Sequence, residues 1–106
     1  MDAALKAIAE PRRREILRLV KDEELSAGEI ASHFDISWPA VSQHLGVLKE
    51  AGLVAERRNG VRRLYRVRPE GLTGVQAFLE EFWSDRLAAL KREVEREERR
   101  KDGKRD

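Results

Sequence analysis

The sequence predicts a mainly α-helical domain with a small β-hairpin, in the order of four helices, two strands and one final helix. Three observations predict this fold class. Helix-capping residues mark the starts of two helices near the middle of the chain. Asn59-Gly60 separates two segments in which apolar and polar residues alternate. In the last third of the chain, apolar residues recur at spacings of three and four, the period of a helix. For 106 residues we expect one domain over 1–98 and a disordered tail over 99–106.

The first two helices are separated at Glu10-Pro11. Leu5 and Ile8 mark the apolar face of the first helix. Pro11 suits the first turn of the second helix, because a missing N–H group costs little there. The segment 16–20 supplies the apolar stripe of the second helix, so we expect the two helices to pack together.

A helix, a tight turn and a second helix follow. Ser26 and Glu29 form a capping box, in which each side chain accepts a hydrogen bond from a backbone N–H group at the helix start. This helix is expected to end near Phe34. Ser37 then caps the next helix, with Pro39 in its first turn.

The helix that starts at Ser37 has two unlike faces. Val41, Leu45 and Leu48 fall together on one side of a helical wheel. The opposite side presents small or hydrogen-bonding groups: Pro39, Ser42, Gln43, Gly46 and Glu50. Such a face can approach another surface closely. Gly52 is expected to end the helix in the left-handed conformation.

A basic hairpin follows, with strands over 54–58 and 61–67 joined by a turn at Asn59-Gly60. Pairing across this turn sets Val54 opposite Tyr65, Ala55 opposite Leu64, Glu56 opposite Arg63 and Arg57 opposite Arg62. The net charge is only +2, but residues 57–79 contain six basic side chains and one acidic side chain. This local excess predicts contact with a polyanion at a defined place.

The final helix is expected over 72–98. Its stripe consists of Leu72, Val75, Leu79, Phe82, Trp83, Leu87, Leu90 and Val94. Such a helix would be ~40 Å long, which exceeds what a small core needs. We therefore expect part of the stripe to pack on a partner.

Composition excludes several classes of function. There is no cysteine, which removes disulfides, thiolate metal sites and cysteine nucleophiles. No glycine-rich phosphate loop or cluster of catalytic groups is found, so we expect no catalytic site, no metal site and no cofactor. No segment suits a membrane span or an export signal, so we expect a cytoplasmic protein.

A helix-turn-helix followed by a basic hairpin is the winged-helix arrangement, which binds DNA. The segments PRRREILRLV, LSAGEIASHF, SWPAVSQHLGVLKEAGLV and RRNGVRRLYRV closely resemble the ArsR/SmtB-type bacterial winged-helix repressors. The ending FLEEFWSDRLAALK resembles a branch of that family without metal-binding cysteines. The resemblance covers residues 3–92. It implies a homodimer that reads an inverted repeat in double-stranded DNA and represses transcription.

Site residues follow from this resemblance. The recognition-helix positions are Ser37, Trp38, Ala40, Val41, Ser42, Gln43 and His44, of which Val41 is expected in the core. Ser42 and Gln43 are the expected readers of bases or phosphates. The expected wing contacts are Arg57, Arg58, Asn59, Arg62 and Arg63. The first and last helices would form the dimer interface through Leu5, Ile8, Leu79, Phe82, Trp83, Leu87 and Leu90.

Several alternatives remain open from the sequence. Trp38 departs from the polar residue common at its position in the family, so it either stacks on a sugar, contacts a methyl group or pads the helix start. Arg12, Arg13 and Arg14 either contact the DNA backbone or form a solvated helix start. An inducer would be an unidentified small molecule or protein. The alternative function is a winged helix that binds an acidic protein partner without sequence-specific DNA binding.

Overall fold

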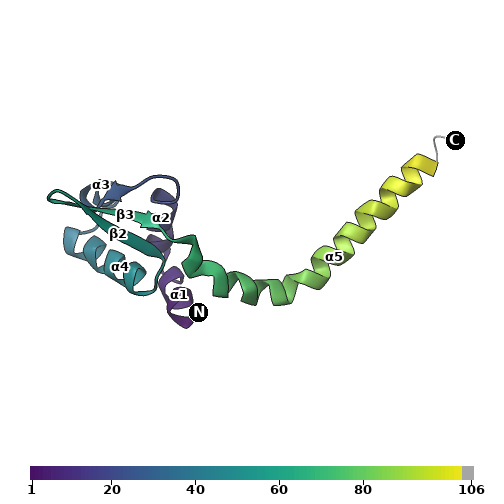
Figure 1. Cartoon of the computed structure of the whole chain (residues 1–106), viewed down its shortest axis with the longest axis horizontal. Coiled ribbons are helices and arrows are strands. Elements are labelled where there is room, and N and C mark those ends of the chain that lie inside the picture. The colour runs from purple at the N-terminus through teal and green to yellow at the C-terminus, as the bar shows by residue number, and fades with distance from the viewer. Residues whose placement is uncertain (104–106) are drawn as a thin grey trace. The chain divides into compact units, whose positions relative to one another are not determined.

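A computed structural model of the protein describes the backbone of residues 1–103 and the side chains of residues 1–101 (Figure 1). The chain divides into two units, Met1–Val75 and the part from Gln76 onward. The first unit contains α1 (Asp2–Ile8), α2 (Pro11–Leu19), β1 (Leu25–Ser26), α3 (Ala27–Ala31), α4 (Trp38–Glu50), β2 (Val54–Asn59), β3 (Arg62–Val67) and the 3-10 helix η1 (Pro69–Leu72). The helix α5 (Thr73–Gly103) begins in the first unit and makes up the second. The predicted mainly helical class with a small β-hairpin is confirmed.

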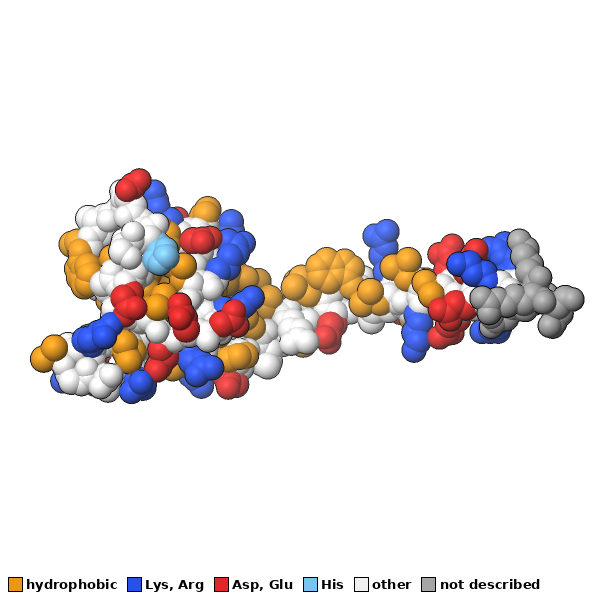
Figure 2. Space-filling model, turned by 90° about the horizontal axis from the view of Figure 1, so that it is seen from above, with side chains coloured by type: hydrophobic (Ala, Val, Ile, Leu, Met, Phe, Trp, Pro, Cys, Tyr) orange, Lys and Arg blue, Asp and Glu red, His pale blue; other side chains and the backbone are white. Residues whose placement is uncertain are grey.

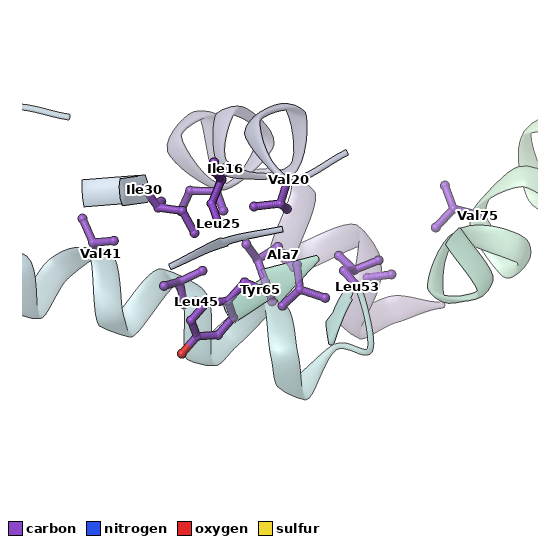
Figure 3. Packing of buried hydrophobic residues seen from close by; sticks show 13 residues of the cluster. Ala7, Ile16, Val20, Leu25, Ile30, Val41, Leu45, Leu53, Tyr65 and Val75 are labelled. Carbon is purple, nitrogen blue, oxygen red and sulfur yellow. The ribbon is translucent and has the colours of Figure 1, made fainter. Parts of the chain in front are cut away.

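The core of the first unit lies where α1, α2 and α4 pack together and against the sheet. Ile16, Ile30 and Leu48 are fully buried in it (Figure 3 shows the cluster). Its other buried members are Ala4, Ala7, Val20, Leu25, Val41, Leu45, Leu53, Val54, Tyr65 and Val75. Burial of these side chains supplies most of the stabilisation of a domain of this size.

Both predicted helix caps around the tight turn are present. The Ser26 hydroxyl accepts from the backbone N–H of Glu29 at 3.2 Å, and the Glu29 carboxylate accepts from the N–H of Ser26 at 3.2 Å. The Ser37 hydroxyl accepts from the N–H of Ala40 at 3.3 Å. These bonds satisfy donors that a helix start would otherwise leave without partners.

The end of α4 is a Schellman motif. Gly52 has φ +77°, the left-handed conformation expected from the sequence. The N–H of Leu53 donates to the carbonyl of Leu48 at 2.9 Å, and the N–H of Gly52 donates to that of Lys49 at 3.0 Å. This motif turns the chain from α4 directly into β2.

The register of the hairpin differs from the prediction by two residues. In the structure Val54 pairs with Val67, Glu56 with Tyr65, and Asn59 with Arg62. The two-residue turn is therefore Gly60-Val61 rather than Asn59-Gly60. Gly60 has φ +67° and, within the described chain, no residue other than glycine has positive φ, so the turn needs left-handed backbone only at its first central residue. A glycine in that place is the signature of a type II′ turn.

The sequence pattern does not predict the short strand β1 (Leu25–Ser26). It pairs antiparallel with β3, so that the sheet has the order β1-β3-β2. Two residues are too few to produce an alternating pattern, and Ser26 also serves as the cap of α3. Pairing with β1 gives β3 a neighbour on both sides.

Two arginines near the start of α2 satisfy carbonyl groups at the end of α1. Arg13 Nε donates to the carbonyl of Ala7 at 2.7 Å, and Arg14 Nη1 donates to that of Ile8 at 2.8 Å. The last carbonyls of a helix have no partner within the helix. Arg13 and Arg14 therefore hold α1 onto α2. This structural role adds to the two considered from the sequence, contact with the DNA backbone and a solvated helix start.

Helix α5 extends further toward the C-terminus than the sequence predicts. Helix α5 continues through residues 99–103, where we expected a disordered tail, and Glu97 and Arg100 form an ion pair one turn apart that supports it. Residues 104–106 of the expected tail lie outside the described residues. The large apolar side chains of α5 beyond Val75, the last residue of the first unit, are exposed.

Replacement of Gly52 tests the helix stop. We expect Gly52→Ala to lower the free energy of unfolding by about 1 kcal/mol, because an L side chain disfavours the left-handed conformation. Gly46→Ala is the matched control, since Gly46 lies inside α4 and an added methyl group there meets open space. It should raise the free energy of unfolding by about 0.5–1 kcal/mol. Urea unfolding followed by circular dichroism measures both, and equal effects of the two variants would contradict the Schellman assignment.

Candidate nucleic-acid interface

Helix α4 is oriented by its buried side. Val41, Leu45 and Leu48 are buried in the core, which leaves Ser42 and Gln43 on the exposed side, as predicted. Gly46 continues this exposed side without a side chain that would obstruct an approaching surface. The exposed side of α4 is therefore small, polar and open.

The remaining predicted residues of α4 divide into two groups. Ser37 and Trp38 are exposed at the start of the helix, whereas Ala40 and His44 are half-buried. His44 Nδ1 lies 3.3 Å from Nη1 of Arg13, so this ring nitrogen faces the protein. His44 thus links α4 to the residue that caps α1.

Trp38 forms one wall of a surface hollow. Its indole lies over Gly28 in α3, where a methyl group would meet the ring at 3.5 Å, yet 56% of Trp38 is exposed. The hollow is about 320 Å³ and is lined by Ser26, Ala27, Gly28, Trp38, Val61, Arg62 and Arg63. The start of α4 and the tip of the hairpin therefore lie at the same end of the first unit (Figure 1).

The hairpin, here called the wing and defined as residues 54–67, is basic at its tip. Arg58 is directly opposite Arg63, and Asn59 is opposite Arg62. All five predicted wing residues are exposed. Val61 is fully exposed at the turn. The sequence pattern places it in a strand and therefore does not single it out as a candidate contact.

Two of the wing arginines are bound to carboxylates. Arg57 makes a bidentate ion pair with Glu24, with Nε to Oε2 at 2.7 Å and Nη2 to Oε1 at 2.8 Å. Arg62 pairs with Glu29, the capping residue of α3. The hydrogen bond from Arg57 holds the pKa of the Glu24 carboxyl below its usual value, and the Ser26 bonds, helped by the Arg62 charge, do the same for Glu29.

A polar network joins α4 to the base of the wing. The Tyr65 hydroxyl donates to the Glu56 carboxylate at 2.9 Å, and Lys49 Nζ lies 3.5 Å from the same carboxylate. The bond from Tyr65 lowers the pKa of Glu56, while burial and this carboxylate raise the pKa of Tyr65. Glu56 therefore fixes the wing relative to the last turn of α4.

The predicted dimer residues lie on two helices with different exposure. Leu5 and Ile8 of α1 are half-buried and pack against the core. On α5 the exposed fractions are 38% for Leu79, 64% for Phe82, 51% for Trp83, 62% for Leu87 and 55% for Leu90. Figure 2 shows hydrophobic side chains gathered along α5 and charged ones nearer its C-terminal end. This is a large apolar surface for a single helix.

Among the described residues, no group of three or more metal-ligating side chains lies together. No helix in this part of the chain combines the length and hydropathy needed to cross a bilayer.

Comparison with known proteins agrees with this geometry. The arsR family of bacterial regulatory proteins matches residues 10–56, from the cap of α2 into β2. The HTH-type transcriptional regulator Rv2034 of Mycobacterium tuberculosis is 40% identical over 96 residues, which cover 91% of this chain and 90% of the relative. The chain belongs to the arsR family.

Further relatives and solved structures extend the comparison. The transcriptional repressor SdpR of Bacillus subtilis is 47% identical over 60 residues, covering 57% of this chain and 67% of the relative. The crystal structure of a possible transcriptional regulator for arsenical resistance superposes with a TM-score of 0.70 at 43% identity, covering 84% of this chain and 95% of that chain. This arsR-family protein is a transcriptional regulator with a winged helix-turn-helix fold.

Proposed function

We propose that the protein binds specific sequences of double-stranded DNA, with α4 in the major groove and the wing on the adjacent backbone or minor groove. The observation that carries this proposal is that the open polar side of α4 and the basic tip of the wing lie at the same end of one unit. An α-helix fits the major groove, and arginines suit phosphates and narrow minor grooves. Membership of a family of transcriptional regulators supports it.

Ser42 and Gln43 are the proposed readers of base edges. Both are exposed on the side of α4 that faces away from the core. A glutamine side chain can bind adenine with two hydrogen bonds, and a serine hydroxyl can serve a base or a phosphate. Ser37, Trp38, Ala40 and His44 flank them, and the Trp38 indole offers an apolar surface to a deoxyribose or a thymine methyl group.

The protein is proposed to act as a homodimer. The exposed stripe of α5 is the surface that a second copy would cover, together with the parts of Leu5 and Ile8 that remain accessible. A two-fold dimer presents the same surface from both copies. Two copies of α4 would then enter successive major grooves ~34 Å apart and select an inverted repeat.

Repression by occupancy of a promoter is the proposed regulatory outcome. The relative SdpR is named as a transcriptional repressor and is 47% identical over 60 residues. Release from DNA would follow binding of a small molecule or protein inducer, or a fall in the concentration of the protein itself. We propose that the protein acts without a cofactor and in the cytoplasm.

Selection of genomic DNA fragments on the purified protein at physiological salt tests the binding proposal. We expect enrichment of an inverted repeat, and loss of that enrichment in the double variant Ser42→Ala, Gln43→Ala, with salt-dependent general binding retained. Ser84→Ala, on α5, is the control and should select the same repeat as the wild type. If the double variant selects it too, the reading face is wrongly assigned. If the wild type selects nothing, the better account is a winged helix that binds an acidic protein.

The dimer proposal is tested by placing a charge in the α5 stripe. We expect Leu87→Glu to raise the dissociation constant of the dimer by roughly tenfold or more, because it would bury an uncompensated carboxylate. Ala88→Glu introduces the same charge on the opposite side of the helix and should leave the constant unchanged. Sedimentation velocity over a concentration series measures both. Equal weakening by the two variants, or none by Leu87→Glu, would exclude this stripe as the interface.

A further inference from the structure

The four tip arginines of the wing occupy two different electrostatic settings. Side chains alternate between the faces of a strand, and directly paired residues share a face. The observed register therefore puts Arg57 and Arg62 on one face of the wing, and Arg58 and Arg63 on the other. The register predicted from the sequence separates the same two pairs, because it differs from the observed register by two residues, but it does not reveal which carboxylates the arginines contact.

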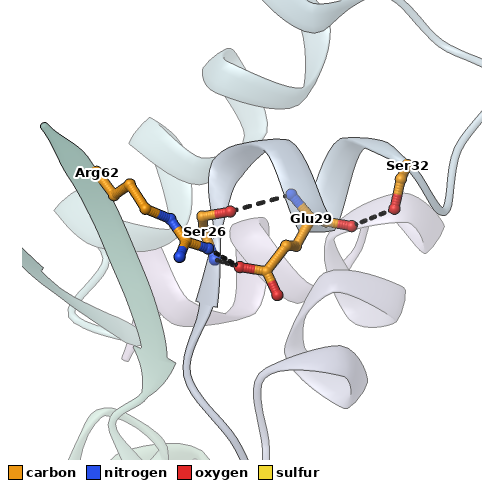
Figure 4. Close-up of polar contacts among 4 residues, drawn as sticks. All are labelled: Ser26, Glu29, Ser32 and Arg62. Carbon is orange, nitrogen blue, oxygen red and sulfur yellow. Dashed lines mark hydrogen bonds and ion pairs between the residues drawn. The ribbon is translucent and has the colours of Figure 1, made fainter. Parts of the chain in front are cut away.

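Arg57 and Arg62 are each paired with a carboxylate from residues 24–29, the segment that contains β1 and the start of α3. Glu24 lies immediately before β1 and binds Arg57 through both carboxylate oxygens. Glu29 binds Arg62 while it also accepts from the backbone N–H of Ser26 (Figure 4). The Arg57–Glu24 pair is bidentate and charge-assisted, a geometry that orients both groups. Glu29 contacts Arg62 through a single guanidinium nitrogen.

The opposite face retains its positive charge. Arg58 and Arg63 lie directly opposite each other, and neither forms an ion pair with a carboxylate in the described part of the chain. Glu56, on the same face, already binds Tyr65 and Lys49, and Arg63 influences its pKa only as a more distant charge. Like charges directly opposite on a hairpin are destabilising. An unneutralised pair at an exposed tip is suited to an external anion.

We propose that Arg58 and Arg63 make the phosphate contacts of the wing, and that Glu24 and Glu29 are positioning residues that keep Arg57 and Arg62 away from the DNA backbone. This inference rests on the proposed DNA binding and assigns different roles in it to the two pairs of arginines. Arg57 and Arg62 then set the angle of the wing by tying it to β1 and α3. The number of ions released on binding is smaller than the arginine content of the wing suggests.

The salt dependence of DNA binding tests this division, because each phosphate contact contributes about 0.9 to the slope of log affinity against log salt concentration. We expect Arg58→Gln and Arg63→Gln each to flatten the slope by about 0.9, which is roughly a 3.5-fold change in the affinity ratio over a fourfold change in salt. Arg57→Gln and Arg62→Gln are the matched controls, and they should leave the slope unchanged. Equal flattening by all four variants, or none by Arg58→Gln and Arg63→Gln, would overturn the proposal.

A second pair of variants tests the carboxylates directly. Glu24→Gln and Glu29→Gln remove one negative charge each while keeping a similar shape, so Arg57 or Arg62 becomes available to a phosphate. We expect each slope to steepen by up to about 0.9, and wild-type slopes in both would overturn the positioning role. Thermal unfolding of every variant verifies folding. Absence of sequence-selective DNA binding by the wild-type protein would contradict the proposed function itself. If the wild-type protein binds DNA selectively but the two pairs of arginine variants show the same salt dependence, only this inference is contradicted.

Discussion

The one-sided burial of α4 is the constraint on which the rest of the structure depends. Val41, Leu45 and Leu48 can enter the core in only one rotational setting of the helix, and that setting leaves Ser42 and Gln43 exposed. The Ser37 cap and the Schellman motif at Gly52 then fix where the helix begins and ends. A shift of α4 by a single residue would turn its polar side by about 100° and bury it.

The C-terminal end of α4 determines the position of the wing. Gly52 and Leu53 turn the chain into β2, and the Lys49–Glu56–Tyr65 network fastens the base of the wing to α4. Pairing with β1 and the ion pairs from Glu24 and Glu29 hold the other face. The wing is thus held from both faces, so that its tip presents a defined pair of arginines rather than a diffuse positive charge.

Much of the fold could be predicted from the sequence because its signals are local. The capping box at Ser26, the Ser37 cap and the glycine stop at Gly52 each act within a few residues, and all three are present. The hairpin register could not be predicted, because Asn59-Gly60 and Gly60-Val61 are both acceptable turns. In the observed register Glu56 lies opposite Tyr65, whose hydroxyl donates to it, and a local turn signal does not reveal this contact. The ion pairs of Arg57 and Arg62 join residues 33 positions apart, so no local pattern reveals them.

The central claim is that one continuous surface, made by the exposed side of α4 and the tip of the wing, binds DNA. It is tested most directly by nuclear magnetic resonance of the isotope-labelled protein titrated with a DNA duplex recovered by selection. The account predicts that the backbone amide shifts that change most belong to residues 37–46 and 57–63, while those of residues 80–101 change little. Large changes confined to α5, with α4 and the wing unaffected, would contradict it.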